Sequence, residues 1–206
     1  ALGSTASPRT FFPAILSAMN GITMPPKLLP PPTQPMTTSG YSPAGAHEWV
    51  RGICEKPRGK CGDCRHRSFR PVTDDVIRWH LSGKDDGGQA FVAGVYPMLQ
   101  DDTCYFLAID FDKNAWQQDV LAFAAACRAR GLAPAVERSR SGRGAHVWFF
   151  FEEPIPAALA RKVGSLLLTE TMERRPDIGF DSYDRLFPNQ DTLPHGGFGN
   201  LIALPL

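Results

Sequence analysis

The sequence predicts an α+β fold with an RRM-like core, in which two strand-helix-strand halves share one sheet. The main observation is the order of patterns from residue 104 onward: strand, helix, strand, strand, helix, strand. A second observation is size, because 206 residues with 43% hydrophobic side chains suffice for one globular domain and some additions. A third is composition, which turns proline-rich and then cysteine-rich before this regular region begins.

The first regular elements are a helix and a hairpin. The stretch 73–83 predicts a short helix, with Thr73 as its N-cap, acidic residues in its first turn and Gly83 as its stop. The apolar runs 91–99 and 104–112 are strand-like, and the three residues "QDD" in the linker between them favour a hairpin.

The later elements complete the split βαβ pattern. Helical spacing of Trp116, Val120, Phe123 and Cys127 predicts a helix that Gly131 ends. Pro156 suits the first turn of a second helix. In chain order, the predicted elements are helix 115–131, strands 133–139 and 145–153 around the turn "SRSGRG", helix 155–175, and strand candidates 178–183 and 198–206.

Two segments precede this region. Residues 1–40 are expected to form a disordered leader, because nine of the nineteen prolines lie within about the first 45 residues. Residues 41–72 hold Cys54, Cys61 and Cys64 and predict a small cysteine-rich knob. Residues 73–206 then form the main domain, which we expect to be truncated within its last strand.

Charge and hydropathy exclude some classes of protein. A formal net charge of +1 argues against nucleic-acid binding through bulk charge, although a local basic groove remains compatible with it. No apolar run reaches the roughly 18 residues of a transmembrane helix, so we expect no membrane partner. Clustered cysteines indicate metal binding rather than disulfides, in a protein that we expect to be cytoplasmic.

Asp110 and Asp112 are the first candidate site residues. Residues i and i+2 of a strand point to one side, so both carboxylates project together while Phe111 faces away. Adjacent carboxylates raise each other's pKa unless a cation lies between them, and oxygen ligands suit Mg²⁺ or Mn²⁺. The alternative is a strand that ends in solvent with two ordinary exposed charges.

Two further motifs carry chemistry. In "ERSRSGRGAHVWFFF", glycines would let backbone N–H groups approach phosphate, with Arg143 as a fork of donors and His146 within reach. The alternative is an exposed turn with a satisfied histidine. In "GFDSYDRLFPNQD", Asp181 would end another strand, followed by Asp184 and Arg185. A third carboxylate would complete a two-metal site for phosphoryl transfer.

The cysteine cluster "CEKPRGKCGDCRH" predicts a structural zinc site. A C-x2-C pair, Cys61 and Cys64, follows Cys54, and three thiolates need one more ligand for tetrahedral coordination. The alternative is three reduced thiols in a loop. Cys104 and Cys127 lie on a strand and on a helix stripe, which indicates core positions instead.

Three quoted segments carry a resemblance to a known family: "AIDFD", "SRSGRGAHVW" and "FDSYDRLFPNQDTLPHGGFGNLIALPL". They resemble the catalytic motifs of archaeo-eukaryotic primases, in the branch of TOTE conflict-system and CRISPR-associated primase-polymerases. The resemblance covers residues 41–206. It implies a DNA primase-polymerase that transfers nucleotides from nucleoside triphosphates onto a strand paired with a single-stranded DNA template. A metal-dependent nuclease and a non-catalytic nucleic-acid-binding module are the alternatives.

The resemblance also implies roles for single residues. The implied metal ligands for Mg²⁺ or Mn²⁺ are Asp110, Asp112 and Asp181, with Asp184 as the competing third carboxylate. The implied contacts to the triphosphate are Ser141, Arg143, His146 and Arg185. Together they would support attack of a 3′-hydroxyl on an α-phosphate.

Two features depart from the resemblance. The family's fourth zinc ligand is a cysteine just before a Glu-Trp pair, where this chain has Gly45. We therefore expect His47 to complete the site with Cys54, Cys61 and Cys64, or His66 to replace it from the other side. The leader also lacks the arginine-rich, acidic segment of relatives, which continue into helicase and nuclease domains. We expect this chain to be a fragment of such a larger polypeptide.

Overall fold

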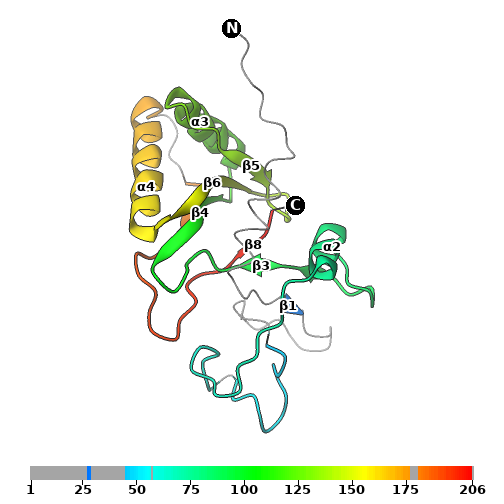
Figure 1. Cartoon of the computed structure of the whole chain (residues 1–206). Coiled ribbons are helices and arrows are strands. Elements are labelled where there is room, and N and C mark those ends of the chain that lie inside the picture. Colours follow the sequence, from blue (N-terminus) through cyan, green and yellow to red (C-terminus); the bar gives the residue numbers. More distant parts are fainter. Residues whose placement is uncertain (1–26, 29–44, 57, 177–180, 206) are drawn as a thin grey trace. The chain divides into compact units, whose positions relative to one another are not determined.

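The computed structural model describes residues 27–28, 45–56, 58–176 and 181–205, drawn as coloured ribbon in Figure 1. The chain forms two compact units, Ala1–Val95 and Tyr96–Leu206. The predicted leader lies outside the described residues except for Lys27 and Leu28. The predicted segment boundaries at residues 40 and 72 stay predictions.

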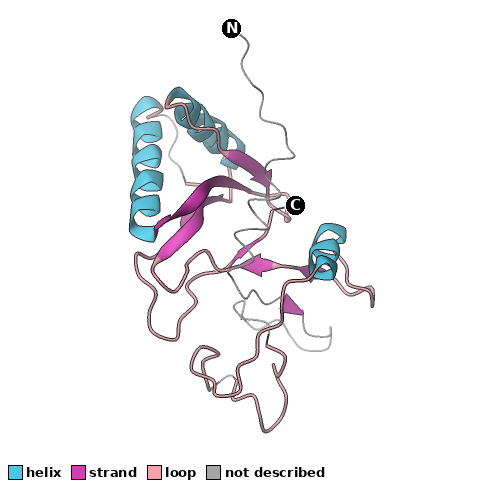
Figure 2. Ribbon diagram, viewed as in Figure 1, coloured by secondary structure: helices cyan, strands magenta, loops and turns pink. Residues whose placement is uncertain are grey.

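The second unit has the predicted split βαβ topology. Its sheet has the strand order β5-β6-β4-β7, and each neighbouring pair is antiparallel (Figures 1 and 2). The strand order agrees with the sequence pattern, because each helix connects two parallel strands that do not neighbour each other. In chain order the elements are β4 Thr103–Phe111, α3 Trp116–Ala129, β5 Ala135–Arg138, β6 Ala145–Pro156, α4 Ala157–Arg174 and β7 Tyr183–Phe187.

Alternation along the strands gives the sheet two different faces. Leu107, Ile109 and Phe111 of β4 belong to a buried cluster with Phe123 of α3. Helix α4 comes close to the same face, since a Cβ on Gly164 would lie 3.1 Å from the side chains of Leu107 and Leu186. The helices therefore cover this face, and the intervening residues of each strand point to the opposite one.

The last strands differ from the prediction. Of the predicted strand 178–183, residues 178–180 lie outside the described part, and residues 181 and 182 form a turn. Strand β7 begins only at Tyr183, because the apolar residues that pack against β4 are Leu186 and Phe187. The predicted strand 198–206 is reduced to β8, Ile202–Ala203. Asp181 therefore precedes a strand instead of ending one.

The predicted strand 91–99 is also interrupted. It is divided into β2 Phe91–Val92 and β3 Gly94–Val95. A single bridge between Met98 and Cys104 follows, with a hydrogen bond from Leu99 N to Thr103 O at 2.8 Å. Pro97 has no N–H to donate to a ladder, so the predicted hairpin is limited to this bridge.

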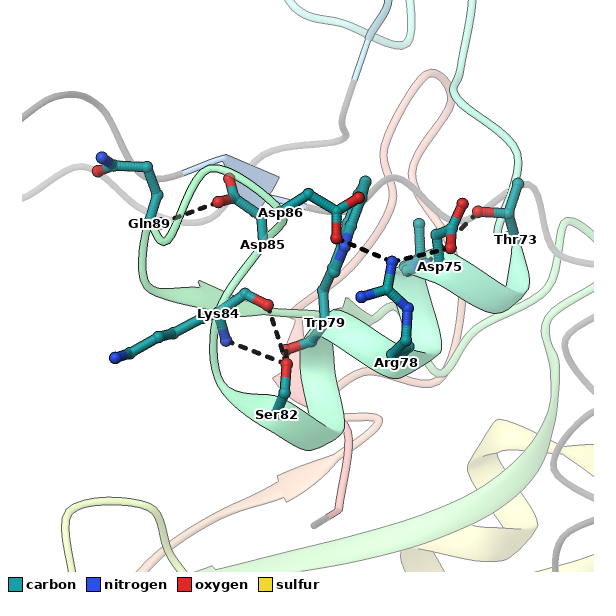
Figure 3. Close-up of polar contacts among 10 residues, drawn as sticks. Thr73, Asp75, Arg78, Trp79, Ser82, Lys84, Asp85, Asp86 and Gln89 are labelled. Atoms are coloured by element: carbon teal, nitrogen blue, oxygen red, sulfur yellow. Dashed lines mark hydrogen bonds and ion pairs between the residues drawn. The ribbon is translucent and has the colours of Figure 1, made fainter.

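Helix α2 of the first unit, Asp74–Ser82, confirms the predicted start and stop signals. The Thr73 side chain accepts a hydrogen bond from Val76 N, and Gly83 ends the helix at a φ of 72°. Figure 3 shows Arg78 between Asp75 and Asp86, with Nη2 at 3.0 and 2.9 Å from their carboxylates. The exposed pair with Asp75 lies within the helix, and the exposed pair with Asp86 connects the helix to the loop that follows it.

A short ladder in the first unit was not predicted. Strand β1, Lys27–Leu28, pairs antiparallel with β2 in the register Lys27 to Val92 and Leu28 to Phe91. Lys27 and Leu28 lie between prolines and retain their backbone N–H groups, so pairing is possible over these two residues.

Within the described residues, no helix is both long enough and apolar enough to cross a bilayer.

Candidate functional site

A row of four polar side chains crosses the sheet on the face opposite the helices. The register pairs Glu137 of β5 with His146 of β6, His146 with Asp110 of β4, and Asp110 with Arg185 of β7. Each strand contributes one residue, and acidic and basic groups alternate along the row. Directly paired side chains on one face contact each other, so the row forms a connected electrostatic unit.

The next row on this face is apolar. Ala135, Trp148, Ala108 and Phe187 occupy successive strands in the same way. Trp148 and Ala108 are buried, and the Trp148 ring stacks on Phe150 with an interplanar angle of 3°. The polar row therefore borders an apolar surface, where charge interactions are stronger than in water.

His146 lies between two carboxylates. Its Nδ1 is 3.2 Å from Glu137 Oε2, and its Nε2 is 3.6 Å from Asp110 Oδ1. Burial acts to lower the pKa of His146, but the hydrogen bond with Glu137 and the charges of Asp110 and Glu137 outweigh it and raise the pKa. The imidazole is therefore held as a cation over a wider pH range than in water.

Asp110 is a carboxylate in an unfavourable position for its charge. Burial raises the pKa of Asp110, and the negative charges of Asp184 and Asp112 raise it further. The positive charges of His146 and Arg185 act to lower this pKa, but the net shift is upward. A cation among Asp110, Asp112 and Asp184 would relieve this repulsion.

Asp112 directly follows the end of β4. Its backbone N–H donates to Ser182 O at 2.7 Å, which joins the strand end to the start of β7. The Oδ1 atom is buried and accepts no hydrogen bond from the described residues, and Lys113 Nζ is 3.8 Å away. A buried carboxylate oxygen without a donor fits a metal cation, whose ligand it could become.

A bulge places Asp184 and Arg185 together on β7. The register advances by one residue on β4, from Asp110 to Phe111, but by two on β7, from Arg185 to Tyr183. Tyr183 and Leu186 both pack against the core under the helices, so the two residues between them face the other way. Arg185 Nε donates to Asp184 Oδ2 at 2.5 Å.

The predicted third carboxylate, Asp181, is exposed in the turn before β7. Asp184 is the alternative third carboxylate, and its charge acts on Asp110. Of the predicted site residues, Asp110, Asp112, His146 and Arg185 thus lie together, with Asp184 among them.

Hydrogen bonds within the turn close the connection between β5 and β6. Ser139 N donates to Gly144 O at 2.9 Å, and Arg138 Nη2 donates to Gly142 O at 3.0 Å. The predicted phosphate contacts Ser141 and Arg143 are exposed in this turn, and Arg143 N donates to Ser141 Oγ at 3.2 Å.

Gly144 joins this turn to the carboxylate strand. A Cβ at this position would lie 2.5 Å from Phe111 O and 3.2 Å from the Asp112 Cα. Only a glycine permits this approach, which brings the turn next to the end of β4.

Sequence reasoning missed Glu137 and the pair Asp119–Ser182. Glu137 could have been found from the six-residue turn "SRSGRG". A hairpin with this turn as its loop pairs Glu137 with His146. Ser182 Oγ donates to Asp119 Oδ2 at 2.5 Å, and both side chains are buried. No local pattern indicated that pair, because its members are 63 residues apart.

The cysteine-rich segment surrounds a cavity of about 40 Å³ in the first unit. The predicted ligands Cys54, Cys61, Cys64 and His47 line it, and so does the alternative ligand His66. His47 Nδ1 is 3.1 Å from the backbone carbonyl of His66.

Lys56 adds positive charge to this cavity. Burial acts to lower the pKa of Lys56, but Glu48, whose Oε1 is 2.7 Å from Nζ, and Cys61 raise it.

As the side chains stand, no three Cys, His, Asp or Glu residues of the described ranges are arranged so that they could hold one metal ion. This applies to the acidic residues near β4 and to the cysteines. Both sets have donor atoms of the kinds that such ions bind, carboxylate oxygens for Mg²⁺ or Mn²⁺ and thiolates with imidazole for Zn²⁺.

The antiparallel split βαβ sheet, with Asp110 and Asp112 at the end of β4, agrees with a domain of the archaeo-eukaryotic primase class, which supports a primase-like nucleotidyltransferase. The family model described as "TOTE conflict system, Archaeo-Eukaryotic Primase domain" matches residues 33–206. The chain therefore belongs to this family. No curated protein matches it.

Proposed function

We propose that the second unit joins nucleotides to a DNA strand on a single-stranded DNA template, using nucleoside triphosphates. The observation that carries the proposal is the polar row, in which Asp110 lies opposite both His146 and Arg185 and beside Asp112. The row offers carboxylates for cations and basic groups for a triphosphate within one small area.

Asp110, Asp112 and a third carboxylate would hold Mg²⁺ or Mn²⁺. The raised pKa of Asp110, and the Asp112 Oδ1 atom that accepts no hydrogen bond from the described residues, support the first two residues. The charge interaction with Asp110 supports Asp184 as the third, while Asp181 stays the alternative. When bound, the ions would stabilise the attacking 3′-oxygen and the leaving pyrophosphate oxygen.

The basic and polar groups would orient the triphosphate. His146 and Arg185 flank Asp110, and Ser141 and Arg143 are exposed in the neighbouring turn. Guanidinium and imidazolium groups bind phosphate oxygens by charge-assisted hydrogen bonds. These residues would hold the α-phosphate in line with the 3′-hydroxyl, so the protein contributes positioning and charge neutralisation.

The cysteine-rich cavity would hold a structural Zn²⁺. Cys54, Cys61 and Cys64 would supply three thiolates, and His47 or His66 the fourth ligand. The other expected partners are helicase and nuclease domains on a longer polypeptide.

A primer-extension assay with Asp112→Asn tests the proposed function. We expect at least about a hundredfold loss of synthesis with Mg²⁺ or Mn²⁺, and unchanged binding of the primer-template. Asp74→Asn, an exposed acid on α2, is the matched control and should extend normally. Equal extension by the wild type and Asp112→Asn would refute the assignment.

Comparison of Asp181→Asn with Asp184→Asn identifies the third carboxylate. We expect the larger loss of extension for Asp184→Asn, because the charge of Asp184 acts on Asp110. A larger loss for Asp181→Asn would instead assign the role to the residue in the turn.

A further inference from the structure

Glu137 accepts two hydrogen bonds on one oxygen. Its Oε2 is 3.2 Å from His146 Nδ1 and 3.0 Å from Trp148 Nε1. The indole N–H of Trp148 donates to this oxygen. A carboxylate oxygen accepts, so the bond with His146 requires a proton on Nδ1. The Glu137 side chain is only 12% exposed, which makes both bonds stronger than on an open surface.

The Trp148 bond fixes where the Glu137 oxygen lies. Trp148 is 2% exposed and stacks on Phe150, so its indole N–H has little freedom. The hairpin register adds a backbone constraint, because Glu137 is paired with His146 and Ala135 with Trp148. The acceptor presented to His146 is therefore held from two sides.

This arrangement defines which histidine nitrogen faces the site. With Nδ1 bonded to Glu137, Nε2 points toward Asp110, at 3.6 Å from its Oδ1. A neutral imidazole has two tautomers, and a carboxylate at Nδ1 selects the one protonated there. Nε2 then faces Asp110 in both forms of the ring, and in the charged form it carries a proton that it can donate to Asp110 or to a phosphate oxygen.

We propose that Glu137 is a positioning residue for nucleotide binding: it holds the His146 ring so that Nε2 faces Asp110 and the incoming triphosphate. The role in nucleotide binding rests on the proposed function, whereas the restraint on the ring does not. Trp148 takes part as the anchor of Glu137.

Nitrogen NMR of the 206-residue chain measures the protonation of the ring directly. Among five histidines, the His146 signals are those that disappear in His146→Ala. We expect a proton on Nδ1 at every pH in the wild type, and its loss from the neutral ring in Glu137→Ala. Glu137→Gln should retain it, since the amide oxygen can still accept. An unchanged His146 spectrum in Glu137→Ala would overturn the proposal.

A double-mutant cycle for dATP binding with Mg²⁺, followed by calorimetry, tests the consequence. We expect Glu137→Ala to weaken binding about tenfold, the size of one charge-assisted hydrogen bond. In the His146→Ala background the same change should have no further effect, because the residue acts through the ring. Trp148→Phe keeps the aromatic ring and should weaken binding less than Glu137→Ala.

Other outcomes separate the two proposals. If Glu137→Ala weakens dATP binding equally with and without His146, Glu137 has a general structural role and the positioning proposal is wrong. If the wild type binds neither dATP nor ATP, the proposed function fails, and the NMR result alone decides the restraint on the ring. Should Glu137→Ala fail to fold, Glu137→Asp replaces it, with the charge kept but the oxygen withdrawn by one methylene.

Discussion

At the scale of single residues, the candidate site depends on close approaches that side-chain chemistry alone does not show. His146 contacts a carboxylate on each side, and Asp112 has a buried oxygen without a donor. Gly144 provides the space for the turn that carries Ser141 and Arg143. The environment of these residues comes from segments that are distant in the sequence, which distinguishes the site from ordinary exposed positions.

Gly144→Ala should disrupt the site through the backbone. The new Cβ would lie 2.5 Å from Phe111 O, so the turn or the end of β4 must move. We expect a loss of about 1–3 kcal/mol in the free energy of unfolding and reduced primer extension. Chemical denaturation measures the first. The control is Gly87→Ala, where the added Cβ would meet a side-chain oxygen, Asp85 Oδ1 at 3.3 Å, and no backbone oxygen; a similar loss in both variants would contradict the explanation.

His146→Gln should change how stability depends on pH. The folded-state pKa of His146 is raised, so its charged form stabilises the fold below the ordinary value of 6.5. That contribution disappears as the pH rises through the folded-state pKa. Denaturation between about pH 6 and 8 should therefore show a difference between wild type and variant that shrinks with rising pH. A difference that is constant, or grows with pH, would contradict the raised pKa.

At the scale of elements, the buried Asp119–Ser182 pair joins the first turn of α3 to the residue before β7. The helix N-terminus favours the Asp119 charge, and the Ser182 hydroxyl donates to it. Ser182 O also accepts from Asp112 N. One residue thus connects the helix, the carboxylate strand end and the strand that carries Asp184.

Ser182→Ala should destabilise the second unit by about 1–3 kcal/mol, because it leaves the buried Asp119 carboxylate without its donor. Thermal unfolding measures the effect. Gln117→Ala, an exposed change in the same helical turn, should have little effect. If both variants unfold like the wild type, the pair does not contribute to stability.

Most elements of this unit could be predicted from sequence, since their signals are local. The spacing of Val120, Phe123 and Cys127 identified α3, and the apolar run before Asp110 identified β4. The start of β7 could not be predicted, because the bulge at Asp184 exists only in its pairing with β4. Asp181 therefore looked like the end of a strand although it lies in a turn.

At the scale of the whole molecule, the chain combines a primase-type sheet with a separate cysteine-lined cavity. Elemental analysis of freshly purified protein should find close to one zinc per chain. Cys64→Ser should lower the content, and comparison of His47→Ala with His66→Ala should identify the fourth ligand. Cys127→Ala is the control and should retain zinc, because burial raises its thiol pKa to about 11. A zinc-free wild type would refute the site.

The sequence by itself determined the family, the order of strands and helices in the second unit, and the pair of carboxylates at the end of a buried strand. These features depend on local periodicity and on motifs that are continuous in the chain. Only the tertiary structure decided that Glu137, His146, Asp110 and Arg185 form one row, and that the charge of Asp184 acts on Asp110. The physical reason is register: which residues face each other across strands depends on turns, bulges and packing between segments far apart in the sequence.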